Sequence, residues 1–290
     1  MKAARVALVT CESVPDLPPD ELLLIRALAV RGVRAQAAVW SDPGIAWADF
    51  DTIVIRSAWD YHLRFEAFFG WVDRVAAAGI PVWNPPALLR WNADKTYLRD
   101  LAARGVAVVP TRYLRAGESV SLVSLLAEEG WERAIVKPTV SASAFETWRV
   151  NRNDAPTHDA RFRALIGFRG MMVQPYLTAF EEAGEWSLIF IGGAFSHAVL
   201  KRPARGDFRV QEEHGGSAAA HPPPAGLVED ARRTLAALDG PWLYARVDGC
   251  AVDGALLLSE LELLEPTLYL HLGEDPAGRL ARAIVEMLPA

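Results

Sequence analysis

Short apolar runs alternate with amphipathic segments over the first third of the chain. Four runs that carry few charges, as parallel strands buried on both faces do, lie at residues 5–11, 33–40, 52–56 and 81–83. Between them, residues 21–30 and 64–78 place apolar side chains at helical spacing and stop beside Gly32 and Gly79. This alternation predicts βαβ units and a parallel sheet.

Polar residues follow the third of these strands and mark a candidate substrate site. Ligands of open parallel sheets bind beyond the carboxyl ends of the strands, where this sequence has Arg56, Ser57 and Asp60. Arg56 could hold a carboxylate or phosphate, and an ordinary ion pair is the equally good alternative. A GxGxxG motif is absent after the first strand, which disfavours a dinucleotide-binding fold.

The middle of the chain carries two lysines at positions that suit an anion. A helix is predicted over residues 94–104 with Lys95 in its first turn, where the helix dipole disfavours a cation unless an anion lies nearby. Lys137 ends an apolar strand at 133–138 and precedes a loop of small residues, 138–146, whose backbone N–H groups could approach phosphates. A solvated lysine and an ordinary hairpin loop are the alternatives.

The next segment combines a hairpin with a cluster of cationic residues. Glu185 opens a predicted strand that turns back at Gly192-Gly193 into a second strand, 194–200. A basic loop follows, with cations at Lys201, Arg202, Arg205 and Arg209. Such a loop suits negative charge that develops on a phosphoryl group, although a mobile solvated loop is the alternative.

Three carboxylates lie on the two strands predicted within residues 244–270. Glu260 and Glu262 are two residues apart, so their side chains share one face of the sheet. Together with Asp248 they would suit a hard cation such as Mg²⁺. The alternative is a solvated strand edge, which the leucines interleaved with the glutamates disfavour.

The turn between these two strands decides whether Asp248 joins the glutamates. A two-residue Asp253-Gly254 turn would place Asp248 opposite Ser259, on the wrong face. A three-residue loop, 252–254, or an equivalent bulge would place it opposite Leu258, on the correct face. We expect the three-residue loop or the bulge.

Composition excludes several classes of protein. The chain has 290 residues, 51% hydrophobic and 23% charged, which describes a globular protein of two domains or three small ones. A net charge of −6 argues against a nucleic-acid partner, and neither a membrane-length apolar run nor a signal-peptide pattern occurs. Cys11 and Cys250 lack CxxC partners, so a cytoplasmic location is expected.

The order of these signals resembles the ATP-grasp superfamily, in particular the branch of glutathione synthetases and the ribosomal-protein glutamate ligase. The stretches GEWSLIFIGG, FSHAVLKRP and GDFRVQEEHGG look like the small ligases that include the D-cycloserine-forming type. The resemblance implies an α/β ATP-grasp fold. It would comprise an N-terminal parallel-sheet pre-ATP-grasp domain (1–90), a small central α+β lid domain (91–175) and a C-terminal antiparallel-sheet domain with the metal site (176–290).

The resemblance also implies ligand contacts. ATP would be bound by Lys95, Lys137, Ser141, Ser143, Gln174, Tyr176, Leu177 and Glu185. The lysines would meet the phosphates, residues 139–144 would close over them, and the residues from Gln174 onward would meet adenine and ribose. Two Mg²⁺ ions, with Mn²⁺ as a substitute, would be held by Asp248, Glu260 and Glu262.

Contacts to the reacting group are implied in the same way. An acyl phosphate would be stabilised by Arg209, with Arg202 and Arg246 as lesser candidates, and substrate would meet Arg56, Ser57, Asp60 and Thr267. Three departures from the family pattern stand out. Glu262 replaces a frequent Asn, Ser187 stands where glutathione synthetases carry Arg, and the loop 138–144 has no glycine.

The implied activity is that of an ATP- and Mg²⁺-dependent carboxylate–amine ligase that forms an acyl phosphate. Its substrate would be a small amino-acid-like molecule, with intramolecular cyclisation in antibiotic biosynthesis as one form. The absence of GxSxG and HExxH motifs agrees, since this chemistry needs no side-chain nucleophile. The alternatives are a ligase that tailors a peptide or protein, and a regulatory protein that binds nucleotide without turnover. A homodimer or homotetramer is a further expectation from the family.

Overall fold

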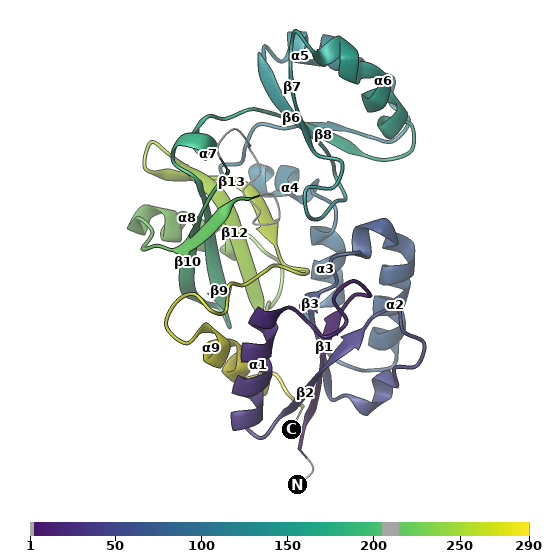
Figure 1. The fold of residues 1–290 in the computed structure, drawn as a ribbon, viewed down its shortest axis with the longest axis vertical. Coiled ribbons are helices and arrows are strands. Elements are labelled where there is room, and N and C mark those ends of the chain that lie inside the picture. The colour runs from purple at the N-terminus through teal and green to yellow at the C-terminus, as the bar shows by residue number, and fades with distance from the viewer. Residues whose placement is uncertain (1–2, 205–214, 290) are drawn as a thin grey trace.

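The computed structural model describes residues 3–204 and 215–289. Over these ranges the chain forms three β-sheets with flanking helices, arranged along one long axis (Figure 1). None of the helices in the described ranges combines the length and the hydropathy that crossing a bilayer requires.

The first sheet is parallel, in the order β2-β1-β3-β4, as the alternating pattern predicts. Its strands are β1 (Arg5–Thr10), β2 (Arg34–Val39), β3 (Thr52–Ser57) and β4 (Val82–Trp83). Helices α1 (Pro19–Val30) and α2 (Phe65–Ala77) connect them. All of β3 is buried, because both faces of the sheet are covered.

The second sheet is antiparallel, in the order β5-β8-β6-β7. It consists of β5 (Arg112–Leu114), β6 (Arg133–Pro138), β7 (Trp148–Asn151) and β8 (Met171–Pro175). The helices α5 (Leu122–Glu128) and α6 (Ala155–Ile166) pack on it at the upper end of the molecule (Figure 1). The sequence did not predict α6, because this helix buries only Ala155, Phe162 and Ile166 and its apolar stripe is thin.

The third sheet is antiparallel, in the order β11-β10-β9-β12-β13. Its strands are β9 (Glu185–Ile191), β10 (Ala194–Arg202), β11 (Ser217–Ala220), β12 (Tyr244–Val252) and β13 (Ala255–Glu262). A short helix, α7 (Ala179–Glu182), precedes it, and α8 (Ala225–Ala236) and α9 (Pro276–Glu286) flank it.

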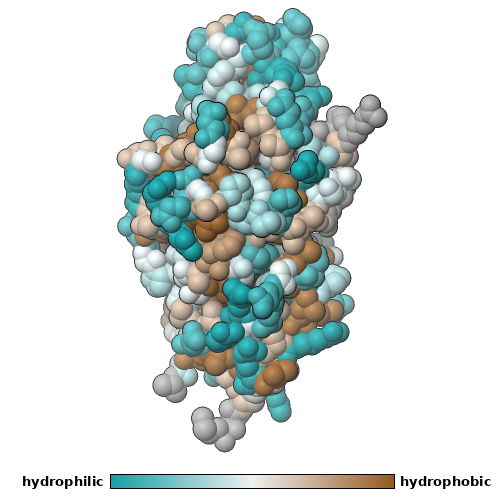
Figure 2. Space-filling view, turned by 90° about the vertical axis from the view of Figure 1, so that its left-hand side faces the viewer, coloured by the Kyte–Doolittle hydropathy of each residue, from teal (hydrophilic) through white to brown (hydrophobic). Residues whose placement is uncertain are grey.

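The first and third sheets share one hydrophobic core. Helix α9 lies beside α1, and Leu24 and Leu28 of α1 belong to the same buried cluster as Leu280 and Ile284 of α9 (Figure 1). Figure 2 shows that hydrophilic positions predominate over the α5–α6 end of one face, whereas both kinds mix over the rest of it. The shared core joins the two sheets that flank the cavity described below.

The helix predicted over residues 94–104 begins later in the structure, at Tyr97. The structure has α3 (Pro86–Asn92), then a turn, and then α4 (Tyr97–Ala103), so that Lys95 lies in the turn. The backbone N–H of Lys95 donates to Thr139 O at 2.8 Å, and Asp94 accepts from the N–H of Thr96 at 2.9 Å. These bonds replace helical ones, so the helix-dipole argument for Lys95 does not apply.

The hairpin β12–β13 closes through the two-residue turn, so the predicted three-residue loop is wrong. Val252 pairs with Ala255, and Asp253 and Gly254 both have positive φ, as a tight hairpin turn requires. The equivalent bulge is present instead: Gly249 pairs with Leu258 but Asp248 pairs with Glu260. The bulge therefore turns Asp248 to the face of the glutamates, as expected.

Glycine is required at position 249 by this bulge. A Cβ atom there would lie 2.4 Å from the carbonyl oxygen of Leu257, far inside van der Waals contact. The close backbone approach is what lets the strand change register within one residue.

Candidate active site

A cavity of about 490 Å³ lies where the three sheets approach one another. Trp59 and Tyr61 reach it from the segment that follows β3, Lys137 from the second sheet and Glu260 from the third. The residues predicted from sequence that line it are Lys95, Lys137, Ser141, Ser143, Gln174, Tyr176, Leu177, Glu185, Arg246, Asp248, Glu260, Glu262 and Thr267. The structure thus collects side chains that lie more than half the chain apart in sequence.

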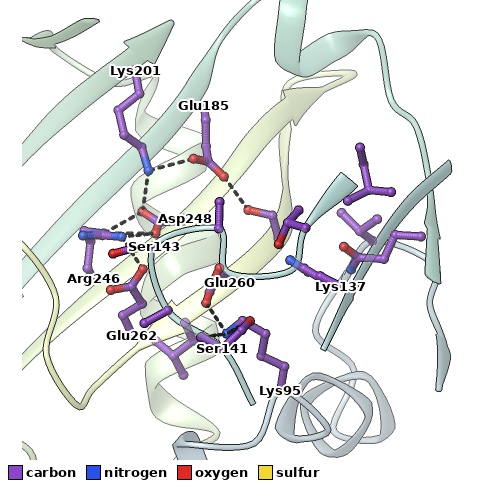
Figure 3. A pocket seen from close by; sticks show the side chains of 18 of the residues that line it. Lys95, Lys137, Ser141, Ser143, Glu185, Lys201, Arg246, Asp248, Glu260 and Glu262 are labelled. Atoms are coloured by element: carbon purple, nitrogen blue, oxygen red, sulfur yellow. Dashed lines mark hydrogen bonds and ion pairs between the residues drawn. The ribbon is translucent and has the colours of Figure 1, made fainter. Parts of the chain in front are cut away.

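A continuous line of ion pairs runs along the third-sheet wall of the cavity (Figure 3). Lys201 Nζ lies 2.7 Å from Glu185 Oε2 and 3.6 Å from Asp248 Oδ1. Arg246 Nη2 lies 2.9 Å from Asp248 Oδ2 and also contacts Glu262. Each metal-ligand candidate on this wall is therefore already neutralised by a cation.

Lys95 and Lys137 face the same cavity but differ in their partners (Figure 3). Lys95 Nζ lies 3.1 Å from Glu260 Oε1 and donates to Ser141 O at 2.6 Å. Lys137 has no ion-pair partner among the described residues. Burial lowers the pKa of Lys137, and the nearby Lys95 cation lowers it further. Lys137 is thus a cation that an incoming anion would stabilise.

The carboxylates of the cavity have pKa values that diverge. Burial raises the pKa of Glu262 to about 8 against the opposing effect of Arg246, and it raises the pKa of Glu265 to about 7. Burial would also raise the pKa of Asp248, but Arg246 and Lys201 hold it below its usual value. Adding a cation would favour the ionised form of Glu262.

An all-carboxylate donor set suits a hard divalent cation such as Mg²⁺. Among the described residues, however, no three acidic, His or Cys side chains are grouped closely enough to hold an ion by themselves. Asp248 and Glu262 both pair with Arg246, whereas Glu260 pairs with Lys95. A metal would need further ligands or movement of these cations.

The opposite end of the cavity is less charged. Gln174 is buried and donates from its amide to Thr111 Oγ1 at 2.9 Å, and Tyr176 and Leu177 continue from it along the wall. Arg133 lies over the ring of Tyr176, 4.5 Å from its centroid. The predicted loop lies over the Lys95 side of the cavity, with Ser143 at a φ of 47° in the left-handed region.

Three of the predicted substrate residues do not line the cavity. Arg56 is 1% exposed, and its Nη2 lies 2.8 Å from Glu21 Oε1, so its guanidinium is committed to a buried ion pair. Ser57 is buried and donates to Thr10 Oγ1. Asp60 accepts from Trp40 and Arg64 rather than facing the cavity. Of the four predicted substrate residues, Thr267 alone lines the cavity.

The predicted basic loop divides between the cavity, the surface and undescribed residues. Arg202 is exposed and does not line the cavity, because it follows Lys201 on β10 and neighbouring strand residues point to opposite faces. The predicted contact of Arg202 with the reacting group is therefore not kept. Arg209 lies outside the described residues.

Lys201, predicted only as one cation of the basic loop, lies on β10 and lines the cavity. Regular antiparallel pairing from the Gly192-Gly193 turn would place Glu185 opposite Leu200. Lys201 would then point to the other face of the sheet. A register shift between Phe195 and His197 pairs Glu185 with Lys201 instead. Glu265 and Tyr269, which line the cavity, were not predicted, and Ser187, predicted without a role, donates to Asp248 Oδ1 at 2.5 Å.

Comparison with known proteins supplies the family. Residues 6–84 match the family model of the N-terminal domain of D-cycloserine synthetase DcsG. The chain is 32% identical over 302 residues to the cycloserine biosynthesis protein DcsG of Streptomyces lavendulae, covering 98% of each.

Solved structures give the same result. The crystal structure of D-cycloserine synthetase DcsG has a TM-score of 0.88 and 30% identity, covering 99% of this chain and 100% of that one. The RimK domain ATP-grasp protein of Sphaerobacter thermophilus has a TM-score of 0.70 at 22% identity, covering 97% and 100%.

The fold and the cavity therefore define an ATP-grasp ligase, an enzyme that forms C–N bonds with ATP. Two other proteins of this fold were solved with such ligands, a D-alanine–D-alanine ligase from Bacillus anthracis with ATP and the ATP-grasp ligase PsnB with Mg and ADP. Within the class, the chain belongs to the DcsG family.

Proposed function

We propose that this protein ligates a carboxylate to an amine through an acyl phosphate, on a small amino-acid-like substrate. The observation that supports this most is one cavity in which Lys95, Lys137, Lys201 and Arg246 surround the carboxylates of β12 and β13. Cations so placed can neutralise charge that spreads over a transferring phosphoryl group.

ATP would lie across the cavity from the second sheet to the third. Lys137 and Lys95 would bind its phosphates beneath the loop that contains Ser141 and Ser143. Adenine would fit the less charged end at Gln174, Tyr176 and Leu177. Glu185 already accepts from Lys201 and Ser259 and has lone pairs left for ribose hydroxyls.

Asp248, Glu260 and Glu262 would hold two Mg²⁺ ions, with Mn²⁺ as a substitute, together with the phosphates. The metal would neutralise and orient the triphosphate when bound. Burial raises the pKa of Glu262 even beside Arg246, so a further cation would favour the ionised form that a metal ligand needs.

The reaction would proceed in two steps. A carboxylate oxygen of the substrate attacks the γ-phosphorus, the bond to ADP breaks, and an acyl phosphate forms. The amine nitrogen then attacks the carbonyl carbon and loses a proton, a C–N bond forms, and phosphate leaves. Arg246 and Lys201 would stabilise the negative charge, and Arg209, outside the described residues, keeps the acyl-phosphate contact that the resemblance implies.

The substrate we propose is an amino acid whose own side-chain nitrogen closes the ring, as the name of the DcsG relative suggests. The name of that relative supports a role in antibiotic biosynthesis, and a cytoplasmic location stays a prediction. Assembly as a homodimer or homotetramer stays a prediction, as does the division of the chain at residues 90 and 175.

The decisive test uses the purified full-length protein with MgATP and serine derivatives that carry a side-chain nitrogen, in both enantiomers. We expect substrate-dependent release of ADP and phosphate, and transfer of isotope-labelled carboxylate oxygen to the released phosphate. Hydroxylamine added in excess should trap the acyl phosphate as a hydroxamate. Release of AMP and pyrophosphate would overturn the acyl-phosphate mechanism.

A further inference from the structure

Glu265 is a cavity carboxylate that the proposed chemistry does not use. The other acidic residues of the lining have cationic partners: Glu181 with Arg149, Glu185 and Asp248 with Lys201, and Glu260 and Glu262 as described above. Among residues 3–204 and 215–289, Glu265 is the lining carboxylate that forms no ion pair. It is therefore the lining carboxylate most available to a ligand.

Hydrogen bonds to three successive backbone carbonyl groups hold the segment around Glu265 in place. Trp59 Nε1 donates to Glu265 O at 3.2 Å, Arg56 Nη2 to Pro266 O at 3.0 Å, and Arg246 Nη1 to Thr267 O at 3.0 Å. These donors come from the first sheet and from β12, so the segment is fixed between them. A side chain on such a segment can recognise a ligand without a large cost in ordering.

The surroundings of Glu265 suit a positive group. Trp59 and Tyr61 line the same cavity and come from the first-sheet side, opposite the adenine end. The faces of aromatic rings attract ammonium groups, and the effect adds to that of a carboxylate. Lys95 and Arg246 also act on Glu265, but neither of them forms an ion pair with it, so its carboxylate is available to an ammonium group.

We propose that Glu265 binds the ammonium group of the amino-acid substrate and thereby orients its carboxylate toward the γ-phosphate. This inference rests on the proposed function and deepens it, since it assigns the residue that selects an amino acid over a carboxylic acid without an amino group. Arg56, predicted as a substrate contact, acts instead as a positioning residue through Pro266.

The test compares Glu265→Gln, which keeps the shape and removes the charge, with Glu265→Asp, which keeps the charge. In Glu265→Gln we expect the KM for the amino acid to rise about 10- to 100-fold, the range for one hydrogen bond to a charged group, with the KM for ATP unchanged. Glu265→Asp should recover part of the loss. Calorimetric titration of substrate into each variant with MgADP gives the same comparison without turnover.

A substrate analogue that lacks the amino group separates recognition from general damage. The wild-type enzyme should prefer the amine over this analogue, and Glu265→Gln should lose most of that preference. A Glu265→Gln variant that keeps the full preference, or that changes the KM for ATP or the Mg²⁺ requirement instead, overturns the inference. A wild-type enzyme that releases no ADP with any candidate overturns the proposed function itself, so the two failures are distinguishable.

Discussion

Lys95 and Lys137 point into one cavity but contribute differently to stability. Replacing Lys95 by Met leaves Glu260 without its cation, and we expect a loss of about 1–3 kcal/mol in the free energy of unfolding. Replacing Lys137 by Met removes a half-buried charge that has no described partner, so stability should stay the same or rise slightly. Urea unfolding of the two matched variants measures the difference.

The same two variants should both bind ATP more weakly if the lysines meet its phosphates. Equal destabilisation by Lys95→Met and Lys137→Met would contradict the electrostatic difference between them. Unchanged KM for ATP in both would contradict their proposed role.

Glu262 makes stability depend on pH. Its pKa of about 8 in the fold exceeds the usual value of 4.5, so the folded state binds more protons than the unfolded state between those values. Stability contributed by the protonated form is therefore lost as pH rises from about 5 to about 8.

Glu262→Gln cannot ionise and should escape this loss. Relative to wild type it should gain about 1–3 kcal/mol between pH 5 and pH 8, since one unit of pKa corresponds to about 1.4 kcal/mol and neighbouring carboxylates share the effect. Thermal unfolding across this range, with the exposed Glu128→Gln on α5 as control, measures the gain. A pH-independent difference would contradict the raised pKa.

At the scale of elements, the bulge in β12–β13 determines which way Asp248 points. Gly249→Ala would place a methyl group 2.4 Å from Leu257 O, and relieving that clash should cost about 1–3 kcal/mol and lower activity. Gly70→Ala within α2 is the matched control. Its Cβ would lie 3.6 Å from the flexible end of Arg74, so it should stabilise the protein by about 0.5–1 kcal/mol.

Urea unfolding and ADP release compare the two glycine variants. A Gly249→Ala protein with wild-type stability and activity would show that the strand can pair without this close approach. That outcome would remove the bulge from the explanation of the site.

At the scale of the whole molecule, ligand binding should couple the three sheets. Arg246 and Lys95 already neutralise the carboxylates, so Mg²⁺ alone should stabilise the protein little. MgATP should bridge the second and third sheets and, at a hundredfold excess over its Kd, add about 2.7 kcal/mol to the free energy of unfolding.

Thermal shifts with Mg²⁺, ATP and both together measure this synergy, and Asp248→Asn should reduce it. Tight binding of a divalent ion without nucleotide at Asp248 would contradict it. So would equal shifts from ATP with and without metal.

Much of the fold follows from local patterns in the sequence. The apolar runs predict β1 and β3 because burial on both faces leaves no polar alternation, and a shorter apolar run predicts β6, whose burial alternates. The spacing of Glu260 and Glu262 fixes their common face, and family resemblance adds Lys95, Lys137 and the adenine end. The thin apolar stripe of α6 gave no such signal.

Only the tertiary structure decides the rest of the site. Two bulges, at Gly249 and between Phe195 and His197, bring Asp248 and Lys201 into the cavity, and a bulge leaves no reliable mark in a period of two. Arg56 is assigned to Glu21 rather than to substrate by a partner 35 residues away. Periodicity is local, so the sequence predicts which residue types reach the strands. Their partners were decided by packing, because a charge in a fold pairs with whatever the topology places beside it.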